Sequence, residues 1–342
     1  MNSQQPLDMD FFRCPSCGAK SLVRSDDDGV CAQCTQCNEK FGVFEGFPFF
    51  VTKDFMHTVR EANGASIQAN ALDDLEADKV KQANIKYHNS IADQYENDVS
   101  TFDMFRIGGA CQQRLKDTLQ KASETSGRDV LVDVCCGTGN VLSAAEGSFD
   151  KRIGVDISVN MMKIADQRNL LAIGGDATNI PVPDGVANCV TAFSALHHLV
   201  DYPSVVSEMA RVLKPGGTFY TDWDPNGHVT HTGWAVSLMV NTVHFVRRLI
   251  MRGQIPESDE QQVAEFHHNS GPGFEAEKAA DVLRSAGFKS VEVIYHLNPP
   301  SFEKSSGFSL VISVMALLKI ISFVSPTPKN LYPWVAIRAI KN

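Results

Sequence analysis

Residues 130–140 read VLVDVCCGTGN. The apolar run 130–132 is followed by Asp133 and then by a turn of small residues at 135–139. This pattern predicts a buried strand that ends in a glycine turn, with a helix beginning near Val141. Glycines let the backbone approach a ligand closely, and the N–H groups at a helix N-terminus attract anions. The stretch therefore predicts a ligand site, although a Gly-x-Gly turn alone does not specify the ligand.

Strand and helix signals alternate along the rest of the chain. We expect strands at 152–156, 170–173, 188–193, 218–223, 290–296 and 334–340, and helices at 102–122, 203–213 and 275–286. This alternation indicates an open, mostly parallel α/β sheet, whose ligands bind outside the carboxyl ends of the strands. The residues predicted at those ends are Asp133, Asp156, Asp176 and Phe193. Asp156 lies about twenty residues after the glycine turn, where nucleoside-binding βαβ units place a carboxylate that accepts the ribose hydroxyls.

The composition limits the classes of function. The 342 residues are enough for a large domain and a small one. The formal net charge of −9 is opposite to the basic excess of proteins that grip phosphate backbones, so nucleic-acid binding is disfavoured. The start, MNSQQPLDMD, is polar and acidic and shows no signal peptide, so we expect a cytoplasmic location.

The cysteines indicate a metal site rather than disulfides. Five of the nine lie between residues 14 and 37, a distribution that favours a reducing compartment. Cys14-x2-Cys17 and Cys34-x2-Cys37 form two knuckles with a spacing that suits tetrahedral, structural Zn²⁺ with four thiolate ligands. Cys31 offers an alternative second knuckle with Cys34.

The segments around the predicted sheet suggest a division into domains. We expect a zinc-ribbon-like domain at 1–55, a linker with a helical end at 56–84, and the sheet domain at 85–342. Tyr87 and Tyr95 share one face of a predicted helix. That helix either packs on the domain or covers a bound ligand.

Five segments, in matching order and spacing, resemble the class I S-adenosylmethionine-dependent methyltransferases. They are VDVCCGTGN at 132–140, the strand ending at Asp156, GDA at 175–177, ALHHL at 195–199 and EMARVLKPGG at 208–217. The spelling DVCCGTG also resembles the ubiquinone and menaquinone C-methyltransferases, and residues 11–50 resemble zinc ribbons that precede many bacterial methyltransferase domains. The likeness implies a Rossmann-like seven-stranded sheet with helices on both faces, a small N-terminal zinc ribbon and helical cap insertions.

The resemblance also implies roles for residues that match the family's motifs. It places Gly137 and Gly139 against the methionine part of S-adenosylmethionine, Asp133 near its amino group, and the ribose hydroxyls on Asp156. It places Ile157 and Met161 beside the adenine, Asp176 on the adenine amino group with Ala177 next to it, and Phe193 and Ser194 at the sulfonium. Cys135 stands where the family has its first glycine. Tyr87, Tyr95 and Cys135 complete the set of candidate cofactor contacts.

Methyl transfer requires alignment of the nucleophile, exclusion of water and, for some acceptors, removal of a proton. The candidate bases are His197 and His198, just after the fourth strand, although HHL at this place is common in the family without a catalytic duty. Further candidates are His228, His231, His267, His268, Asp222 and Asp224.

Two insertions, at 228–270 and 298–333, interrupt the sheet and carry long apolar stretches. We interpret the stretch at 307–324 first as a lid over a lipophilic pocket, then as a dimer interface or a membrane-surface contact. The expected activity is methyl transfer to a small lipophilic or aromatic acceptor at carbon, oxygen, nitrogen or sulfur. The alternatives are an RNA base methyltransferase with a zinc-ribbon recognition domain, which the acidic charge disfavours, and a non-catalytic cofactor-binding partner subunit, which Asp156 and Asp176 argue against.

Overall fold

The computed structural model describes residues 7–25, 27, 29–62, 77–95, 110–227, 259–269, 273–296 and 334–342. Expectations about the apolar stretch at 307–324, about His228 and His231, and about the side chain of His268 lie outside this description. Within it, none of the helices has the length and apolar character needed to cross a bilayer.

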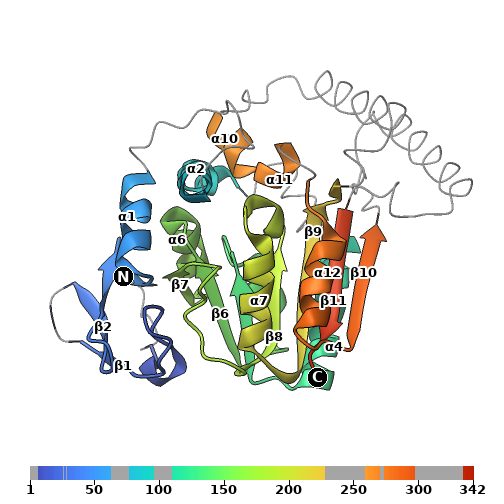
Figure 1. Ribbon diagram of the computed structural model, residues 1–342, viewed down its shortest axis with the longest axis horizontal. Helices are drawn as coiled ribbons and strands as arrows, with labels where there is room; N and C mark the ends of the chain where they lie inside the picture. Colours follow the sequence, from blue (N-terminus) through green and yellow to red (C-terminus); the bar gives the residue numbers. More distant parts are fainter. Residues whose placement is uncertain are drawn as a thin grey trace, which may run out of the picture.

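Seven of the described strands form the predicted sheet (Figure 1). In spatial order they are β7 (Ala172–Gly175), β6 (Lys151–Asp156), β5 (Val130–Val134), β8 (Ala187–Phe193), β9 (Leu213–Pro225), β11 (Trp334–Ile340) and β10 (Ser290–His296). The first five run parallel, whereas β11 is antiparallel to β9 and β10 to β11. The predicted Rossmann-like α/β fold is therefore confirmed.

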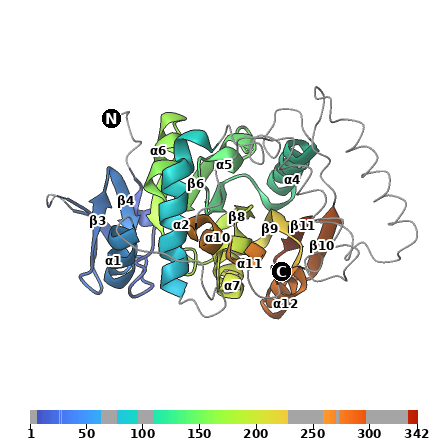
Figure 2. The same cartoon turned by 90° about the horizontal axis from the view of Figure 1, so that it is seen from above.

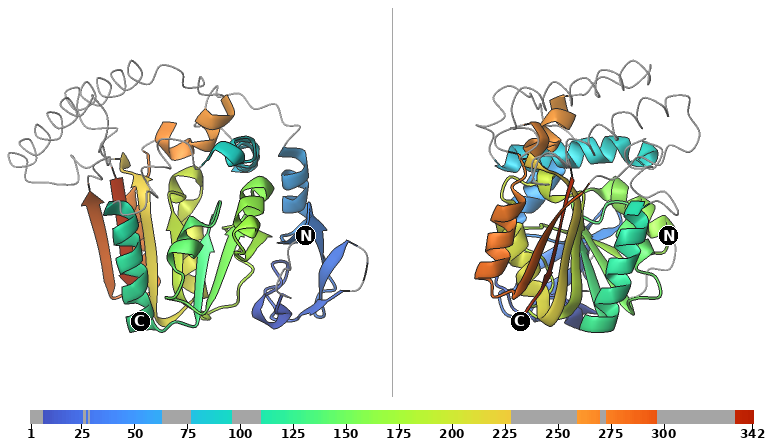
Figure 3. Two further views of the ribbon diagram at one scale, coloured as in Figure 1. Left: turned by 180° about the vertical axis from the view of Figure 1, so that it is seen from behind. Right: turned by 90° about the vertical axis from the view of Figure 1, so that its right-hand side faces the viewer.

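Helices cover both faces of this sheet (Figures 2 and 3). One face carries α4 (Ala110–Ser126), α5 (Asn140–Ala144) and α6 (Val159–Gln167), and the other carries α7 (Tyr202–Val212) and α12 (Ala276–Ser285). All five residues of β5 are buried, as expected for a parallel strand packed on both faces. Each face has its own apolar core, so packing on both sides fixes the strands whose carboxyl ends form the edge.

Three helices lie across the carboxyl edge of the parallel strands (Figure 1). They are α2 (Ala77–Ile91), α10 (Asp259–Ala264) and α11 (Phe266–Asn269). The helix α2 starts inside the expected linker and runs through residue 85, the expected domain boundary. A shorter segment, η4 (Ala92–Gln94), continues it, and α1 (Lys53–Glu61) precedes it.

The N-terminal strands extend the sheet beyond β7. They are β1 (Leu22–Arg24), β2 (Val30–Cys34), β3 (Lys40–Phe44) and β4 (Phe47–Phe50), and β4 pairs parallel with β7. In that pairing Phe49 faces Gly174, where a Cβ atom would overlap the Phe49 ring. Glycine at 174 therefore permits the close approach that joins the cysteine-rich segment to the main sheet.

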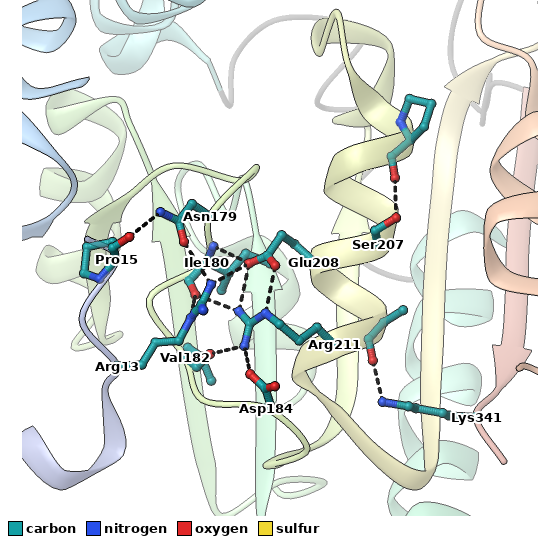
Figure 4. Close-up of polar contacts among 12 residues, drawn as sticks. Arg13, Pro15, Asn179, Ile180, Val182, Asp184, Ser207, Glu208, Arg211 and Lys341 are labelled. Atoms are coloured by element: carbon teal, nitrogen blue, oxygen red, sulfur yellow. Dashed lines mark hydrogen bonds and ion pairs between the residues drawn. The ribbon is translucent and has the colours of Figure 1, made fainter. Parts of the chain in front are cut away.

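Side-chain contacts reinforce this junction (Figure 4). The Arg13 guanidinium, next to Cys14, donates to Glu208 Oε2 at 3.0 Å and to Asn179 Oδ1 at 2.8 Å. Asn179 Nδ2 in turn donates to the Pro15 carbonyl at 2.8 Å. Glu208 also pairs with Arg211 on α7. The first cysteine knuckle is thus anchored to the loop after β7 and to α7.

Candidate active site

The predicted glycine turn links β5 to α5 at the carboxyl edge. Cys136 N donates to the Val155 carbonyl at 3.2 Å, and Gly139 N to the Cys136 carbonyl at 2.9 Å. Gly139 has φ +82°, and a Cβ there would lie 2.5 Å from Leu170 Cδ1. Cys135 has φ +57°, a left-handed conformation that costs a non-glycine residue about 1–2 kcal/mol. Cysteine therefore holds the conformation for which a glycine is better suited.

Asp156, at the end of β6, is a carboxylate fixed in place by two backbone donors. Its Oδ2 accepts from Gly137 N and its Oδ1 from Ser158 N, both at 2.7 Å. Burial raises the pKa of Asp156, while these N–H groups oppose the rise by stabilising the charged form. Each carboxylate oxygen can accept a second hydrogen bond, so the group can bind a pair of hydroxyls.

Asp133, at the end of β5, is also buried but has weaker support. The Thr191 hydroxyl donates to its Oδ1 at 2.7 Å. Burial, together with the nearby charge of Asp156, raises the pKa of Asp133 to about 8. A cation placed beside this carboxyl group would favour its ionised form.

The remaining predicted cofactor contacts lie along the same edge. Asp176 Oδ1 accepts from Thr178 N at 2.9 Å, and Oδ2 forms an ion pair with Lys81 of α2 at 2.9 Å. Phe193 ends β8, and Ser194 follows it with φ +53°. The others are the half-buried Ile157 and the buried Met161 and Ala177. The structure brings this set to one edge, and the role of each residue stays a prediction.

The helix α2 is fastened to this edge through Asn89. Its Oδ1 accepts from Ser158 Oγ at 2.8 Å and from Asn160 N at 3.0 Å, and its carbonyl accepts from Asn160 Nδ2 at 3.0 Å. Both partners lie at the start of α6, beside Asp156. Tyr87 on α2 and Tyr95 just after η4 are half-buried. The tether therefore holds the predicted aromatic contacts over the strand ends.

His197 and His198 form the short helix η5 (Leu196–His198) directly after β8. His197 Nδ1 lies 2.9 Å from Asp224 Oδ1, and His198 Nδ1 lies 2.7 Å from the Ala264 carbonyl. Burial disfavours the charged form of both rings, but the Asp224 and Glu265 carboxylates outweigh it at His197 and raise its pKa to about 9. The pKa of His198 is lowered, by burial first and by the His197 charge second. Their predicted role as bases stays a prediction.

Comparison with known proteins is consistent with this arrangement. A family model described as "Methyltransferase domain" matches residues 132–221. The demethylmenaquinone methyltransferase of Geobacillus sp. (strain WCH70) is 38% identical over 112 residues, which are 30% of this chain and 47% of that protein. The demethylmenaquinone methyltransferase of Geobacillus stearothermophilus is 31% identical over 188 residues, which cover 52% of this chain and 78% of that protein. This chain belongs to the S-adenosylmethionine-dependent methyltransferases.

The match spans about half the length of the first of these relatives. Among solved structures, the phosphoethanolamine N-methyltransferase 2 of Haemonchus contortus in complex with S-adenosyl-L-methionine is similar to this methyltransferase over 74% of this chain and 60% of that chain. The identity is 16% and the TM-score 0.45.

The methyltransferase carries a second polar cluster beyond Phe193, at the end of β9. Asp222 is fully buried and accepts from Arg114 Nε at 2.8 Å, from the Tyr220 hydroxyl at 2.6 Å and from His296 Nε2 at 2.8 Å. Burial favours the neutral acid, but His296 and Arg114 lower the pKa of Asp222. His296 Nδ1 is buried and has no hydrogen-bond partner among the described residues. This imidazole therefore combines a carboxylate partner with a nitrogen that can accept a proton.

Beside this cluster lies a stacked pair of indole rings. Trp223 has φ +65°, a strained conformation for a bulky residue. Its ring stacks on Trp334 of β11 with centroids 4.8 Å apart and planes at 13°. This conformation places the Trp223 indole next to His296, with ring centroids 6.4 Å apart.

The four predicted zinc ligands of the methyltransferase come together. The Cys14 and Cys37 Sγ atoms are 3.6 Å apart, those of Cys17 and Cys34 3.7 Å, and all four lie within 4.8 Å of one another. Tetrahedral Zn²⁺ with bonds of about 2.3 Å separates its sulfur ligands by about 3.8 Å. Cys31 instead approaches the Phe41 carbonyl at 3.2 Å and is not in the group. The arrangement fits Zn²⁺ with the Cys34–Cys37 knuckle.

Sequence reasoning overlooked several residues that shape the site. Three of them contact residues that are distant in sequence, and local sequence patterns do not predict such contacts. They are Asn89, Lys81 and Glu265. His296 had a weak signal, since it ends a predicted strand of the same sheet.

Proposed function

We propose that this chain transfers a methyl group from S-adenosylmethionine to a small lipophilic acceptor of the quinol or hydroxy-aromatic type. One observation carries the proposal. The carboxylate of Asp156 stands at the end of β6, held by the N–H groups of Gly137 and Ser158 in the place where a nucleoside diol is expected. A carboxylate fixed by backbone donors needs no rearrangement to bind the ribose.

The other predicted contacts complete a site for an in-line displacement. The glycine turn would lie against the methionine portion, Asp133 would face its ammonium group, and Phe193 and Ser194 would line the sulfonium. The residues mainly align the acceptor with the methyl carbon and exclude water, the two effects that such a transfer needs.

Two observations support an aromatic, oxygen-bearing acceptor. The relatives are named for demethylmenaquinone. In addition, the stacked Trp223 and Trp334 rings lie next to His296, and aromatic side chains suit an acceptor ring that bears a hydroxyl group.

For proton removal we propose three alternatives, namely the predicted His197 and His198, and His296. His296 is supported by its pairing with Asp222, because a carboxylate partner orients an imidazole that takes up a proton. Substitution of each by Gln separates them. The base variant should lose about 100-fold in kcat with S-adenosylmethionine affinity unchanged. The control is His57→Gln, at an exposed position of α1, which should keep its activity. Equal kcat in all variants would contradict a base among these three.

We also propose that the four-cysteine cluster binds structural Zn²⁺. Four thiolates fill the tetrahedral shell, so this ion would hold the N-terminal strands together rather than take part in methyl transfer.

Isothermal titration with S-adenosylmethionine tests the cofactor site. Because hydrogen bonds to a charged group contribute about 1.5–3 kcal/mol, Asp156→Asn should bind about 10–100-fold more weakly. The matched control is Asp150→Asn, which removes an exposed carboxylate paired with Arg128 and should bind normally. Equal affinity in the two variants would contradict the proposed site.

A further inference from the structure

We propose that this protein holds a second metal ion, a divalent transition metal such as Zn²⁺ or Fe²⁺, between His197, His198 and Glu265. This three-residue set is called the His–His–Glu cluster below. It lies at the carboxyl end of β8, where η5 meets the junction of α10 and α11, and it shares no residue with the four-cysteine cluster.

The distances suit a common ligand. One nitrogen or oxygen atom from each residue of the His–His–Glu cluster lies within 4.8 Å of the others. His197 Nε2 is 3.6 Å from Glu265 Oε2, and the two imidazole centroids are 4.0 Å apart. Metal–ligand bonds of about 2.0–2.2 Å bring neighbouring ligand atoms to about 3.0–3.5 Å. Small side-chain rotations are therefore enough to close the cluster around one ion.

The second observation is the way in which both imidazoles are oriented. His197 Nδ1 donates to Asp224, and His198 Nδ1 donates to the Ala264 carbonyl. An N–H at Nδ1 leaves the lone pair on Nε2, and metal-binding histidines are held by this kind of hydrogen bond to a carboxylate or a carbonyl. Two adjacent histidines thus have Nδ1 engaged in the hydrogen bond typical of metal ligands and Nε2 as the nitrogen that would bind the ion. At His197 the ion would displace the Nε2 proton.

Asp224 strengthens this reading. It is fully buried on β9, and its Oδ1 accepts from both the backbone N and the Nδ1 of His197. A buried carboxylate that orients one imidazole is the arrangement that raises a ligand's basicity toward a metal.

The donor types identify the class of metal. Two imidazoles and one carboxylate suit Zn²⁺ or Fe²⁺, whereas Mg²⁺ and Ca²⁺ favour oxygen ligands alone. Three protein ligands also leave a coordination position for an exogenous oxygen. An oxygen of the acceptor would be a fitting occupant. This last step rests on the proposed function and leaves His296 as the base, because a metal-bound Nε2 cannot accept a proton.

Metal content of the full-length protein tests the proposal without any activity assay. After dialysis against Zn²⁺ and removal of excess ion, elemental analysis should give about two zinc ions per chain. Glu265→Gln and His198→Gln should each give about one. The matched control Glu260→Gln, on the same segment but paired with Lys86, should keep about two. Circular dichroism establishes that each variant is folded.

Co²⁺ titrated into protein that was not dialysed against Zn²⁺, and that carries one zinc ion per chain in the four-cysteine cluster, gives a second readout. Occupation of the His–His–Glu cluster should produce weak visible absorption without the intense near-ultraviolet bands of thiolate ligation, and Glu265→Gln should lack it. One zinc per chain in wild type with no Co²⁺ absorption would overturn the proposal, as would unchanged zinc content in folded Glu265→Gln. Either result leaves the titration with S-adenosylmethionine unaffected, so the two proposals fail separately.

Discussion

Two buried carboxyl groups at neighbouring strand ends differ in their hydrogen-bond partners. Asp156 accepts hydrogen bonds from two backbone N–H groups, whereas Asp133 accepts one from the Thr191 hydroxyl. Burial raises the pKa of both groups, and at Asp156 the two backbone donors oppose that rise by stabilising the carboxylate. This difference fits the proposed roles, in which Asp156 binds a diol and Asp133 faces a cation.

This difference predicts a pH-dependent cofactor affinity. With the pKa of Asp133 at about 8 in the free protein, binding of the cofactor's ammonium group must release a proton at lower pH. Affinity for S-adenosylmethionine should then rise by up to about tenfold per pH unit between about pH 6 and 7. Isothermal titration in buffers of different ionisation enthalpy measures both the affinity and the released proton. Asp133→Asn should bind weakly, with a flat pH profile; a wild-type profile equally flat would contradict the role of Asp133.

Single residues also show how far the sequence leads. The place of Asp156 follows from the spacing between a glycine turn and the next strand end, both of which are local patterns. The pairing of Asp176 with Lys81 spans 95 positions, and the left-handed backbone of Cys135 contradicts its residue type. Neither could be predicted, because each depends on contacts that form only in the folded chain.

At the level of elements, α2 is held over the site by Asn89. Asn89→Ala removes the acceptor used by Ser158 Oγ and Asn160 N and should lower the free energy of unfolding by about 1–3 kcal/mol. Because both partners closely follow Asp156 in the chain, the variant's affinity for S-adenosylmethionine should also fall. Thermal denaturation and titration measure the two effects.

Ser90→Ala on the same helix is the control for this change. Its hydroxyl donates to the Tyr87 carbonyl on the exposed side, so the variant should behave as wild type. If Asn89→Ala binds the cofactor normally, α2 is a packing helix rather than a cover for the site.

The boundaries of two strands depart from the expected ranges for related reasons. β7 spans 172–175 rather than 170–173, and its two glycines pair with Phe49 and Phe50 of β4. β9 begins at Leu213 rather than 218, because Leu213 pairs with Ala187 before a register shift. Strand ends depend on partners elsewhere in the chain, and hydrophobic periodicity does not report them.

For the whole molecule, the cysteine-rich segment and the main sheet share one hydrogen-bonded edge. Cys17→Ser, which weakens the proposed zinc site, should therefore lower the Tm of the entire chain by more than about 5 °C in a single transition. Differential scanning calorimetry measures this. Cys31→Ser, outside the four-cysteine group, is the matched control and should change Tm little. Two separate transitions with the second unchanged would show that the segment folds independently.

The seven-stranded sheet could be predicted because each strand and helix has its own hydrophobic period and is bounded by turn residues. The docking of the cysteine-rich segment could not. It depends on Arg13 reaching Glu208, 195 positions away, and on a glycine opposite Phe49. The position of the His–His–Glu cluster likewise needs η5 and Glu265 to meet in space.

The central claim is methyl transfer from S-adenosylmethionine, bound at Asp156, to a hydroxy-aromatic acceptor. The most direct measurement is mass spectrometry of the full-length protein incubated with trideuteromethyl-labelled S-adenosylmethionine and reduced demethylmenaquinone. We expect a quinone product heavier by one trideuteromethyl group, formed in step with S-adenosylhomocysteine, and at least tenfold less product with Asp156→Asn at limiting cofactor. Bound cofactor without any labelled quinone, or equal product from the variant, would contradict the claim.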